Sequence, residues 1–383
     1  MAKVTLGEVA VECRESCRGD KSGLPAVGLE HLTPGQIRLS SWAVNTENTF
    51  TKLFRRDDML FGRRRAYLKK AAQAPFDGIC SGDITVIRAR PGKLLPELLP
   101  FIIQNDDLFD FAVGRSDGSL SPRVKWENLK NYTFELPPLT EQKKLAEVLW
   151  SISDTIQAYQ DLLTKTEELV KARFVEMFGD PATNPKGWTT KRLLSMGDCK
   201  NGMNFHAGDT GMKIHCLGVG DFKNLSVIDG TEHLPVISLN EAPSEESLLR
   251  DGDIVFVRSN GNKALVGRCL VVYPRSTPTT YSGFCIRYRL TSGEVDSAYL
   301  LWVLKMDSMR KKMAGRGANI QNLSQQVLAA LDIPLPPIEL QKQFVAFVNQ
   351  ADQSKSALQR TITSLQETKR SLAAEALCMG RKE

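Results

Sequence analysis

The sequence lacks any apolar run that approaches the roughly 20 residues needed to cross a bilayer as a helix. Its first residues, Met-Ala-Lys-Val-Thr-Leu, also lack the apolar core of a signal peptide. The 383 residues are 42% hydrophobic and 25% charged, which is ordinary globular composition with enough apolar material for two cores. We therefore expect a cytoplasmic protein of two domains and connecting helices, neither disordered nor fibrous.

Cysteine is present but scattered, and eight cysteines in a chain of this length do not predict a disulfide framework. Cys13 and Cys17 form a C-x3-C pair, and His215 adjoins Cys216 with His206 nearby, a combination that superficially suggests a metal site. No C-x2-C partner pair supports such a site. We expect most of the cysteines to be small buried apolar residues, and no metal.

Motifs for catalysis are missing as well. The two Pro-Pro pairs, 137–138 and 336–337, follow Leu and precede Leu or Ile, so neither forms the Asp/Asn-Pro-Pro-Tyr motif of an adenine methyltransferase. No G-x4-G-K-[ST] loop exists for ATP-driven work, and the single G-x-G at 218–220 is too weak to predict nucleotide binding. Residues 141–143 spell the E-x-K of many nucleases, but they open a helix, and 339–341 at the second Pro-Pro pair have no lysine. We predict a non-catalytic chain.

An internal repeat is the strongest feature that is present. Residues 136–142 read LPPLTEQ, and residues 335–341, which lie 199 positions later, read LPPIELQ. Four more similar pairs of segments occur in the same order: 27–30 with 217–221, 58–63 with 253–258, 81–88 with 282–289, and 114–115 with 315–316. Five ordered matches predict a duplicated unit, with loops that differ in length between the copies.

Charge is unevenly distributed along this repeat, although the net charge is only +6. Residues 1–140 carry 20 basic and 17 acidic side chains, and residues 186–336 carry 18 and 14. The stretch between them, 141–185, carries 5 and 8, and residues 337–383 carry 7 and 5. The two globular segments are thus mildly basic and the first connecting segment is acidic, which favours a polyanionic partner weakly.

A long helix with a heptad seam is predicted after each Pro-Pro pair. In the first helix, apolar residues alternate in steps of four and three, apart from a gap at Thr166: Leu145, Leu149, Ile152, Ile156, Tyr159, Leu163 and Val170. The second helix keeps the register: Phe344, Val348, Ala351, Leu358, Ile362, Leu365 and Leu372. Lys355 and Lys369 interrupt the second seam, either as solvated ends of long stems or as residues that fix the pairing register.

The alternative is that each helix lies separately on its own domain, but residues 141–178 would span roughly 57 Å, more than a small domain can cover. Because the linker after the first helix is short, the second helix must run back antiparallel to bury its seam on the first. We therefore predict an α+β protein with two mixed α/β domains in tandem repeat, separated by an antiparallel coiled-coil pair and related by a pseudo-two-fold axis. The expected segments are domain 1 at 1–140, a helix at 141–178, a linker at 179–187, domain 2 at 188–336, and a helix at 337–378.

Several of these motifs together resemble the specificity subunit of type I restriction-modification systems. The resemblance rests on the LPP-x-x-EQ joint before a long helix, on RFVEMFGDP at 173–181, on PKGW at 185–188, and on the second joint at 335–341. It spans essentially the whole chain. The second copy departs from the pattern in having Leu340 after its Glu, where the first copy has Gln; because Gln341 follows, we expect little consequence.

The resemblance implies two target-recognition domains, each of which reads one half of an asymmetric bipartite sequence in double-stranded DNA. It also implies that the paired helices act as a spacer and as a docking surface for two modification subunits. Those subunits would carry S-adenosylmethionine and methylate adenine N6, and restriction subunits would join the complex. No cofactor is expected in this chain.

Candidate DNA-binding residues follow one strand and precede the joint in each copy. Guanidinium groups suit phosphates and the guanine edge, and flexible amides or hydroxyls suit phosphates and base edges. The candidates in domain 1 are Arg63, Arg64, Arg65, Lys69, Arg115, Ser119 and Ser121. The candidates in domain 2 are Arg258, Ser259, Asn260, Asn262, Lys263, Arg316, Asn319, Gln321 and Asn322.

The alternative interpretation of these residues is a solvated charged face with simple loops, and the equivalent placement of Arg63 and Arg258 favours DNA contact over it. Two other functions stay open at this point. One is a self-contained DNA methyltransferase or nuclease, against which the missing motifs argue. The other is a coiled-coil scaffold whose helices bind protein and whose domains bind no DNA.

Overall fold

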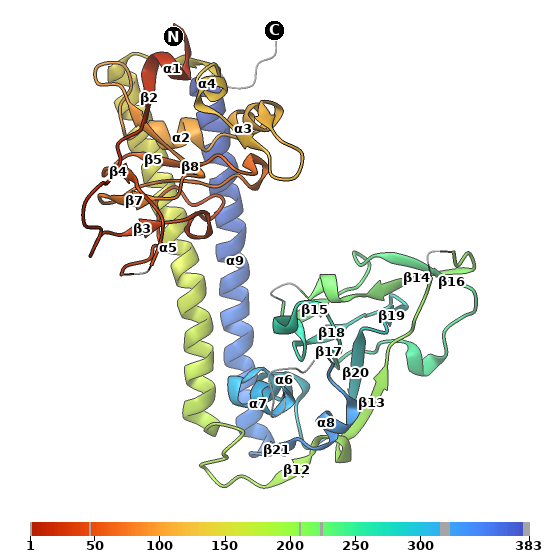
Figure 1. Cartoon of the computed structure of the whole chain (residues 1–383). Coiled ribbons are helices and arrows are strands. Elements are labelled where there is room, and N and C mark those ends of the chain that lie inside the picture. The colour runs from red at the N-terminus through yellow and green to blue at the C-terminus, as the bar shows by residue number, and fades with distance from the viewer. Residues whose placement is uncertain (1, 46, 207, 223–224, 315–321, 378–383) are drawn as a thin grey trace. The chain divides into compact units, whose positions relative to one another are not determined.

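The computed structural model describes residues 2–45, 47–206, 208–222, 225–314 and 322–377. The chain divides into two compact units, and each is described by itself (Figure 1). The first unit combines Met1–Leu162 with Ala357–Glu383, and the second is Leu163–Ser356. Both unit boundaries fall inside the long helices, so each unit holds one globular domain and a segment of both helices.

The first unit is built on a four-stranded sheet of order β2-β8-β5-β6 and a three-stranded sheet of order β3-β7-β4. Along β5, Met59 and Phe61 face the core that the helices cover, while Leu60 faces the core shared with the smaller sheet. This alternation is the period of two expected of a strand that is buried on both faces. The strands are β1 (Ala2–Thr5), β2 (Ala10–Cys13), β3 (Ala26–Val27), β4 (Lys52–Phe54), β5 (Met59–Gly62), β6 (Ala71–Gln73), β7 (Gly78–Cys80), β8 (Ile84–Ala89), β9 (Ser116–Asp117), β10 (Arg123–Val124) and β11 (Thr133–Leu136). The short helices are α1 (Leu6–Val9), α2 (Leu99–Ile103), α3 (Asp106–Gly114) and α4 (Trp126–Leu129).

The second unit repeats this plan with a five-stranded sheet of order β13-β20-β17-β18-β15 and a three-stranded sheet of order β16-β14-β19. Along β17, Ile254 and Phe256 face the helical core, and Val255 and Val257 face the other. The strands are β12 (Thr190–Arg192), β13 (Gly197–Asn201), β14 (Met212–Leu217), β15 (Val227–Asp229), β16 (Val236–Leu239), β17 (Asp253–Val257), β18 (Cys269–Tyr273), β19 (Thr279–Tyr281), β20 (Cys285–Leu290) and β21 (Asp332–Pro334). The short helices are α6 (Ser297–Lys305), α7 (Asp307–Ala314) and α8 (Gln325–Ala329). The extended backbone at Met306 (ψ 138°) separates α6 from α7.

Strand register shows that the two domains are copies. Leu60 on β5 pairs with Val86 on β8, and Val255 on β17 pairs with Arg287 on β20, which are the same positions at offsets of 195 and 201. The parallel pairs β3·β7 and β14·β19 match in the same way. The predicted fold class, two mixed α/β domains in tandem, is confirmed.

Each domain is followed by a 40-residue helix, α5 (Leu139–Phe178) and α9 (Ile338–Leu377). In the first unit, Leu149 near the start of α5 shares a core with Leu377 at the end of α9. In the second unit, Phe174 near the end of α5 lies with its ring centroid 5.3 Å from that of Phe344 near the start of α9. This order of contacts is that of an antiparallel pair. Among the described residues, no helix is long and apolar enough to span a membrane.

None of the predicted seam residues is exposed. The buried ones are Leu149, Ile156, Val170, Phe344, Val348 and Ile362, and the half-buried ones are Leu145, Ile152, Tyr159, Leu163, Ala351, Leu358, Leu365 and Leu372. Of the two interrupting lysines, Lys355 forms an ion pair with Asp352 one turn earlier at 2.8 Å. Lys369 is half-buried, and this burial lowers the pKa of its ammonium group.

A buried glutamine fixes each long helix to its own domain. Gln142 is 1% exposed; its Nε2 donates to the carbonyls of Pro137 (2.9 Å) and Lys93 (3.1 Å), and its Oε1 accepts from the N–H of Leu95 (3.0 Å). The side chain therefore closes the Pro-Pro joint and also holds the loop that precedes α2.

Gln341 repeats these three bonds in the second unit. It is fully buried, donates to the carbonyls of Pro336 (2.8 Å) and Glu294 (3.1 Å), and accepts from the N–H of Asp296 (2.9 Å). The interpretation of Leu340 as a replacement for the glutamine was therefore wrong. Gln341 lies 199 residues after Gln142 and has the equivalent three backbone partners, so it is the counterpart of Gln142. Leu340 then occupies the position of Glu141.

Candidate nucleic-acid interface

The candidate residues of the first unit lie where the chain leaves β5. There the main-chain N–H of Arg63 donates to the carbonyl of Asp83 (3.0 Å), and its carbonyl accepts from the N–H of Val124 (3.0 Å). Three segments that are distant in sequence therefore meet at the end of this strand. They are the chain after β5, the turn before β8, and the chain that leads into α4.

Two arginines share one carboxylate at this place. Arg123 donates through Nε to Asp83 Oδ1 (2.7 Å) and through Nη2 to Oδ2 (3.3 Å), and Arg64 donates to Oδ2 (3.5 Å). Arg64 also donates to the hydroxyl of Ser121 (3.0 and 3.2 Å). The hydrogen bonds from Arg123, with the positive charges around it, hold the pKa of Asp83 below its usual value, so the carboxylate is ionised at neutral pH. We call Arg64, Asp83, Ser121 and Arg123 the first edge.

The other candidates of the first unit lie around this edge without joining its hydrogen bonds. Arg63 is half-buried, and its Nε has no hydrogen-bond partner among the described residues. Arg65 is exposed, with a left-handed backbone (φ 53°), and Lys69 forms an ion pair with Asp106. Arg115 is exposed with its guanidinium 5.5 Å from the ring centroid of Phe111, and Ser119 is exposed in the turn between β9 and β10.

The second unit has the same backbone crossing at the end of β17. The N–H of Arg258 donates to the carbonyl of Phe284 (2.8 Å), and its carbonyl accepts from the N–H of Leu323 (2.7 Å). Arg258 Nη1 lies 3.4 Å from the carbonyl of Gly283. Arg258 therefore occupies the position of Arg63, as the sequence repeat predicted.

An open cavity of about 430 Å³ replaces the arginine cluster there. Its lining residues are Ser259, Asn260, Gly261, Lys263, Phe284 and Asn322. The Phe284 side chain is 61% exposed, and Ser259 pairs with Asn322 as an isolated antiparallel bridge. We call Ser259, Phe284 and Asn322 the second edge. The candidates Arg316, Asn319 and Gln321 lie outside the described residues.

Two of the asparagine and lysine candidates shape the turn beside the cavity. The side chain of Asn260 accepts from the N–H of Asn262 (2.8 Å), and that of Asn262 accepts from the N–H of Ala264 (3.1 Å) and caps a 3₁₀ turn. Lys263 is exposed. The structure thus brings Ser259, Asn260, Lys263 and Asn322 together around one cavity, while Asn262 serves the turn.

Three residues of these edges were not among the candidates: Asp83, Arg123 and Phe284. Asp83 and Phe284 stand at equivalent positions of the aligned segments 81–88 and 282–289, where one copy has a charged side chain and the other an aromatic one. That difference inside an otherwise similar segment was a signal of divergent surfaces. Arg123 lies in a part of the repeat that the sequence comparison did not align.

In each domain a buried carboxylate pairs with an arginine at the other end of the central strand from the edge. Asp58, the residue before β5, accepts two hydrogen bonds from Arg88 on β8 (2.7 and 2.8 Å). Asp253 accepts the same two from Arg289 (2.9 and 2.7 Å). The pairs cross-link the central strands β5·β8 and β17·β20 at the end opposite Arg63 and Arg258. This fixes the two strands whose other ends carry the edges.

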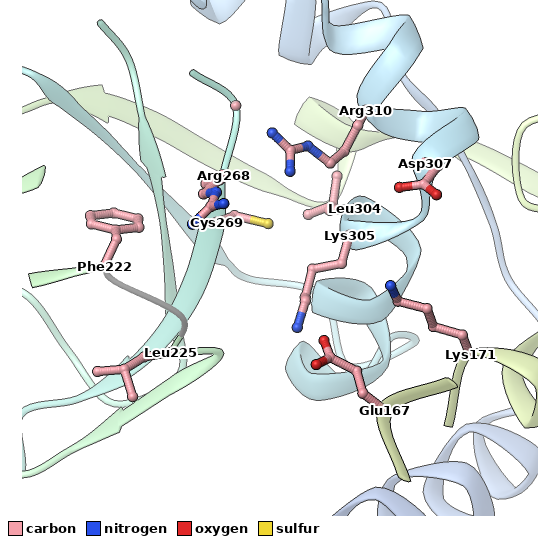
Figure 2. Close-up of a pocket in the computed structure, with 11 residues that line it drawn as sticks. Glu167, Lys171, Phe222, Leu225, Arg268, Cys269, Leu304, Lys305, Asp307 and Arg310 are labelled. Carbon is pink, nitrogen blue, oxygen red and sulfur yellow. The ribbon is translucent and has the colours of Figure 1, made fainter. Parts of the chain in front are cut away.

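A further cavity in the second unit, of about 340 Å³, is lined by the end of α5, by β18 and by α6 and α7 (Figure 2). Figure 2 shows the side chains of Glu167 and Lys305 pointing into the same space. The Lys305 ammonium donates to the hydroxyl of Ser226 (2.5 Å) and lies 4.7 Å from the ring centroid of Trp302, and burial lowers its pKa. Arg310 donates to the carbonyl of Ala264 (3.2 Å). Lys305 and Arg310 thus link α6 and α7 to the segments that carry Ser226 and Ala264.

The fold and edges define a class: a duplicated α/β protein with a glutamine-anchored helix after each domain and a polar edge at each central strand. The family described as "Type I restriction modification DNA specificity domain" matches residues 20–168 and 185–367. The chain belongs to this family, and the matches cover both copies of the repeat.

Individual relatives agree with this assignment. The chain is 26% identical over 287 residues to the type I restriction enzyme StySPI specificity subunit of Salmonella potsdam, and the match covers 67% of this chain and 60% of that subunit. It is 24% identical over 300 residues to the MjaVIII specificity subunit of Methanocaldococcus jannaschii, covering 70% and 68%.

Solved structures show the same fold. A chain from a study of complex assembly and conformational transition of the type I R-M system matches with a TM-score of 0.56 at 22% identity, over 98% of this chain and 97% of that chain. The type I restriction-modification S subunit of M. genitalium also has a TM-score of 0.56, at 13% identity, over 98% and 96%.

Proposed function

We propose that this chain is the DNA-reading, non-catalytic subunit of a type I restriction-modification complex, and that each domain reads one half of a bipartite DNA sequence. The observation that carries the proposal is the duplication of the edge: in both domains the same crossing of three segments presents polar side chains at the end of the central strand. Family membership of both copies supports it. Such a DNA-bound subunit would work in the cytoplasm, where the DNA that it reads would lie.

The paired helices would set the distance between the half-sites and dock the partner subunits. Exposed apolar side chains on α5 are a feature that a protein partner would cover: Val148 and Leu162 in the first unit, and Leu169 and Val175 in the second. The proposed partners are two modification subunits, which would carry S-adenosylmethionine and methylate adenine N6, and restriction subunits in the full complex. The chemistry is assigned to these partners.

Methyl transfer separates this proposal from a self-contained enzyme. The purified chain, incubated with labelled S-adenosylmethionine and DNA, should transfer no methyl group alone and should support transfer once modification subunits are added. Methyl transfer by the chain alone would show that the proposal is wrong.

Binding by arginine variants separates it from a scaffold that binds no DNA. Arg63→Ala and Arg258→Ala should each weaken binding or relax base preference, and each in a different half-site. Arg55→Ala is the matched control, because Arg55 precedes β5 at the opposite end of the strand and is held by Asp77 and Glu15. Equal affinity and equal preference in all three variants would remove Arg63 and Arg258 from the DNA surface.

A further inference from the structure

The two edges occupy equivalent backbone positions but carry different chemistry. Arg64 and Arg123 form an isolated antiparallel bridge in the first unit, and Ser259 and Asn322 form the same bridge in the second. Asp83 and Phe284 are also at equivalent positions. The main-chain carbonyl of Asp83 accepts from the N–H of Arg63 after β5, and that of Phe284 accepts from the N–H of Arg258 after β17. A shared scaffold therefore presents two guanidinium groups on a carboxylate in one domain, and a hydroxyl, an amide and an aromatic ring in the other.

The first edge presents mainly hydrogen-bond donors toward a ligand, because its two arginines are more exposed than the carboxylate between them. The carboxylate of Asp83 is 20% exposed, whereas the side chains of Arg64 and Arg123 are 39% and 43% exposed. A guanidinium has more N–H donors than one carboxylate can accept from, so the bonds to Asp83 fix each group in place and leave donors for a second partner. In the major groove, guanine offers two adjacent acceptors, O6 and N7, while adenine places the N6 donor beside N7. A fixed fork of donors therefore discriminates in favour of guanine.

The second edge combines donors, acceptors and apolar surface without charge. The amide of Asn322 can both donate and accept, which is what the adjacent N7 acceptor and N6 donor of adenine require. Phe284 is 61% exposed, which is unusual for a large apolar side chain and suits contact with the methyl group of thymine. The hydroxyl of Ser259 is compatible with either base. An A·T pair satisfies these groups better than a G·C pair.

We infer that the Arg64–Asp83–Arg123 cluster binds a guanine in the half-site of the first domain, and that the second edge binds an A·T pair in the other half-site. Asp83 is a positioning residue, because it acts through the two arginines. The inference rests on the proposed function and adds to it a chemical assignment for each half-site.

The experiment selects bound sequences from a random duplex library with the full chain, co-purified with the proposed modification subunits. The wild-type complex should enrich a bipartite sequence. Arg123→Lys keeps the charge and loses the fork, so it should reduce the preference for guanine at one position of one half-site, by roughly 5- to 150-fold for a bidentate contact. Arg64→Lys and Asp83→Asn should relax the same half-site, while Asn322→Ala and Phe284→Ala should relax A·T preference in the other half-site only.

Matched controls exist in the same domain. Arg55, which precedes β5, and Asp77, which precedes β7, form an exposed arginine–carboxylate pair (3.3 Å) at the end of β5 opposite the first edge. Arg55→Lys and Asp77→Asn should leave the selected sequence unchanged. Thermal unfolding of each complex verifies that the edge variants are folded, and the second arginine variant keeps the test valid if one variant fails to assemble.

The outcomes separate the two levels of the argument. If the wild-type complex enriches no sequence, the proposed function fails. If it enriches a bipartite sequence whose guanine positions are unaffected by Arg64→Lys, Arg123→Lys and Asp83→Asn, the assignment of the first edge is overturned while the function stands. The same holds for the second edge if Asn322→Ala and Phe284→Ala leave every A·T preference in place.

Discussion

Replacing Gln142 by methionine, which is similar in length but cannot form its hydrogen bonds, tests whether the buried glutamine holds the long helix to its domain. The change removes three hydrogen bonds to backbone groups, at 2.9, 3.0 and 3.1 Å. Each hydrogen bond contributes about 1 kcal/mol net, and the carbonyl of Pro137 would also lose this donor. We therefore expect the free energy of unfolding to fall by about 2–5 kcal/mol. For a unit of this size that corresponds to a fall in Tm of roughly 5–15 °C.

The assay is thermal and urea unfolding of the full chain, followed by circular dichroism, for three variants. Gln341→Met should cause a loss of similar size, because its three bonds are equivalent. Gln343→Met is the matched control: Gln343 is exposed on the same helix, and surface changes usually stay within about 0.5 kcal/mol. If Gln142→Met and Gln341→Met unfold within about 0.5 kcal/mol of the wild type, the glutamines do not anchor the helices and the reasoning is refuted.

Three further predictions concern buried or paired charges. Asp253→Asn should lower the free energy of unfolding, measured in urea, by about 3–5 kcal/mol. Asp58→Asn should lower it less, because its partner Arg88 is 39% exposed whereas Arg289, the partner of Asp253, is 17% exposed. Equal losses would contradict this reasoning. The hydrogen bonds from Arg123 lower the pKa of the Asp83 carboxyl below 3.8. The stability that the wild type has over Asp83→Asn should therefore be fully present above pH 3.8 and disappear as the pH falls through the folded-state pKa. A stability difference that grows on acidification would contradict this reasoning. Lys369→Met should raise the free energy of unfolding by about 0.5–2 kcal/mol, since burial disfavours the ammonium group, and a lower Tm would instead assign this lysine a part in fixing helix register.

The duplication and the helix seams were predictable because they depend on pattern alone. The LPP-x-x-EQ joint and the steps of four and three are visible in one sequence, and every seam residue is buried or half-buried. The alignment of Arg63 with Arg258 placed both correctly at the end of the central strand, since the strand register of one copy is that of the other.

The composition of the edges was not predictable, because it depends on contacts between segments far apart in sequence. Asp83 meets Arg123 across 40 residues, and neither lies in a run of basic residues of the kind that a charge pattern identifies. The arginine run itself was less informative: Arg63 is half-buried, and only Arg64 joins the cluster. Equally, the role of Gln142 could be seen only once its backbone partners were placed.

Mapping adenine methylation across the genome with and without the gene for this chain tests the central proposal most directly. We expect methylation at one asymmetric, bipartite sequence that disappears when the chain is removed and returns when it is restored. A variant with Arg63→Ala should then alter only one half of that sequence. If the pattern of methylated sites is the same with and without the chain, it does not supply the sequence specificity of a restriction-modification complex, and the account is wrong.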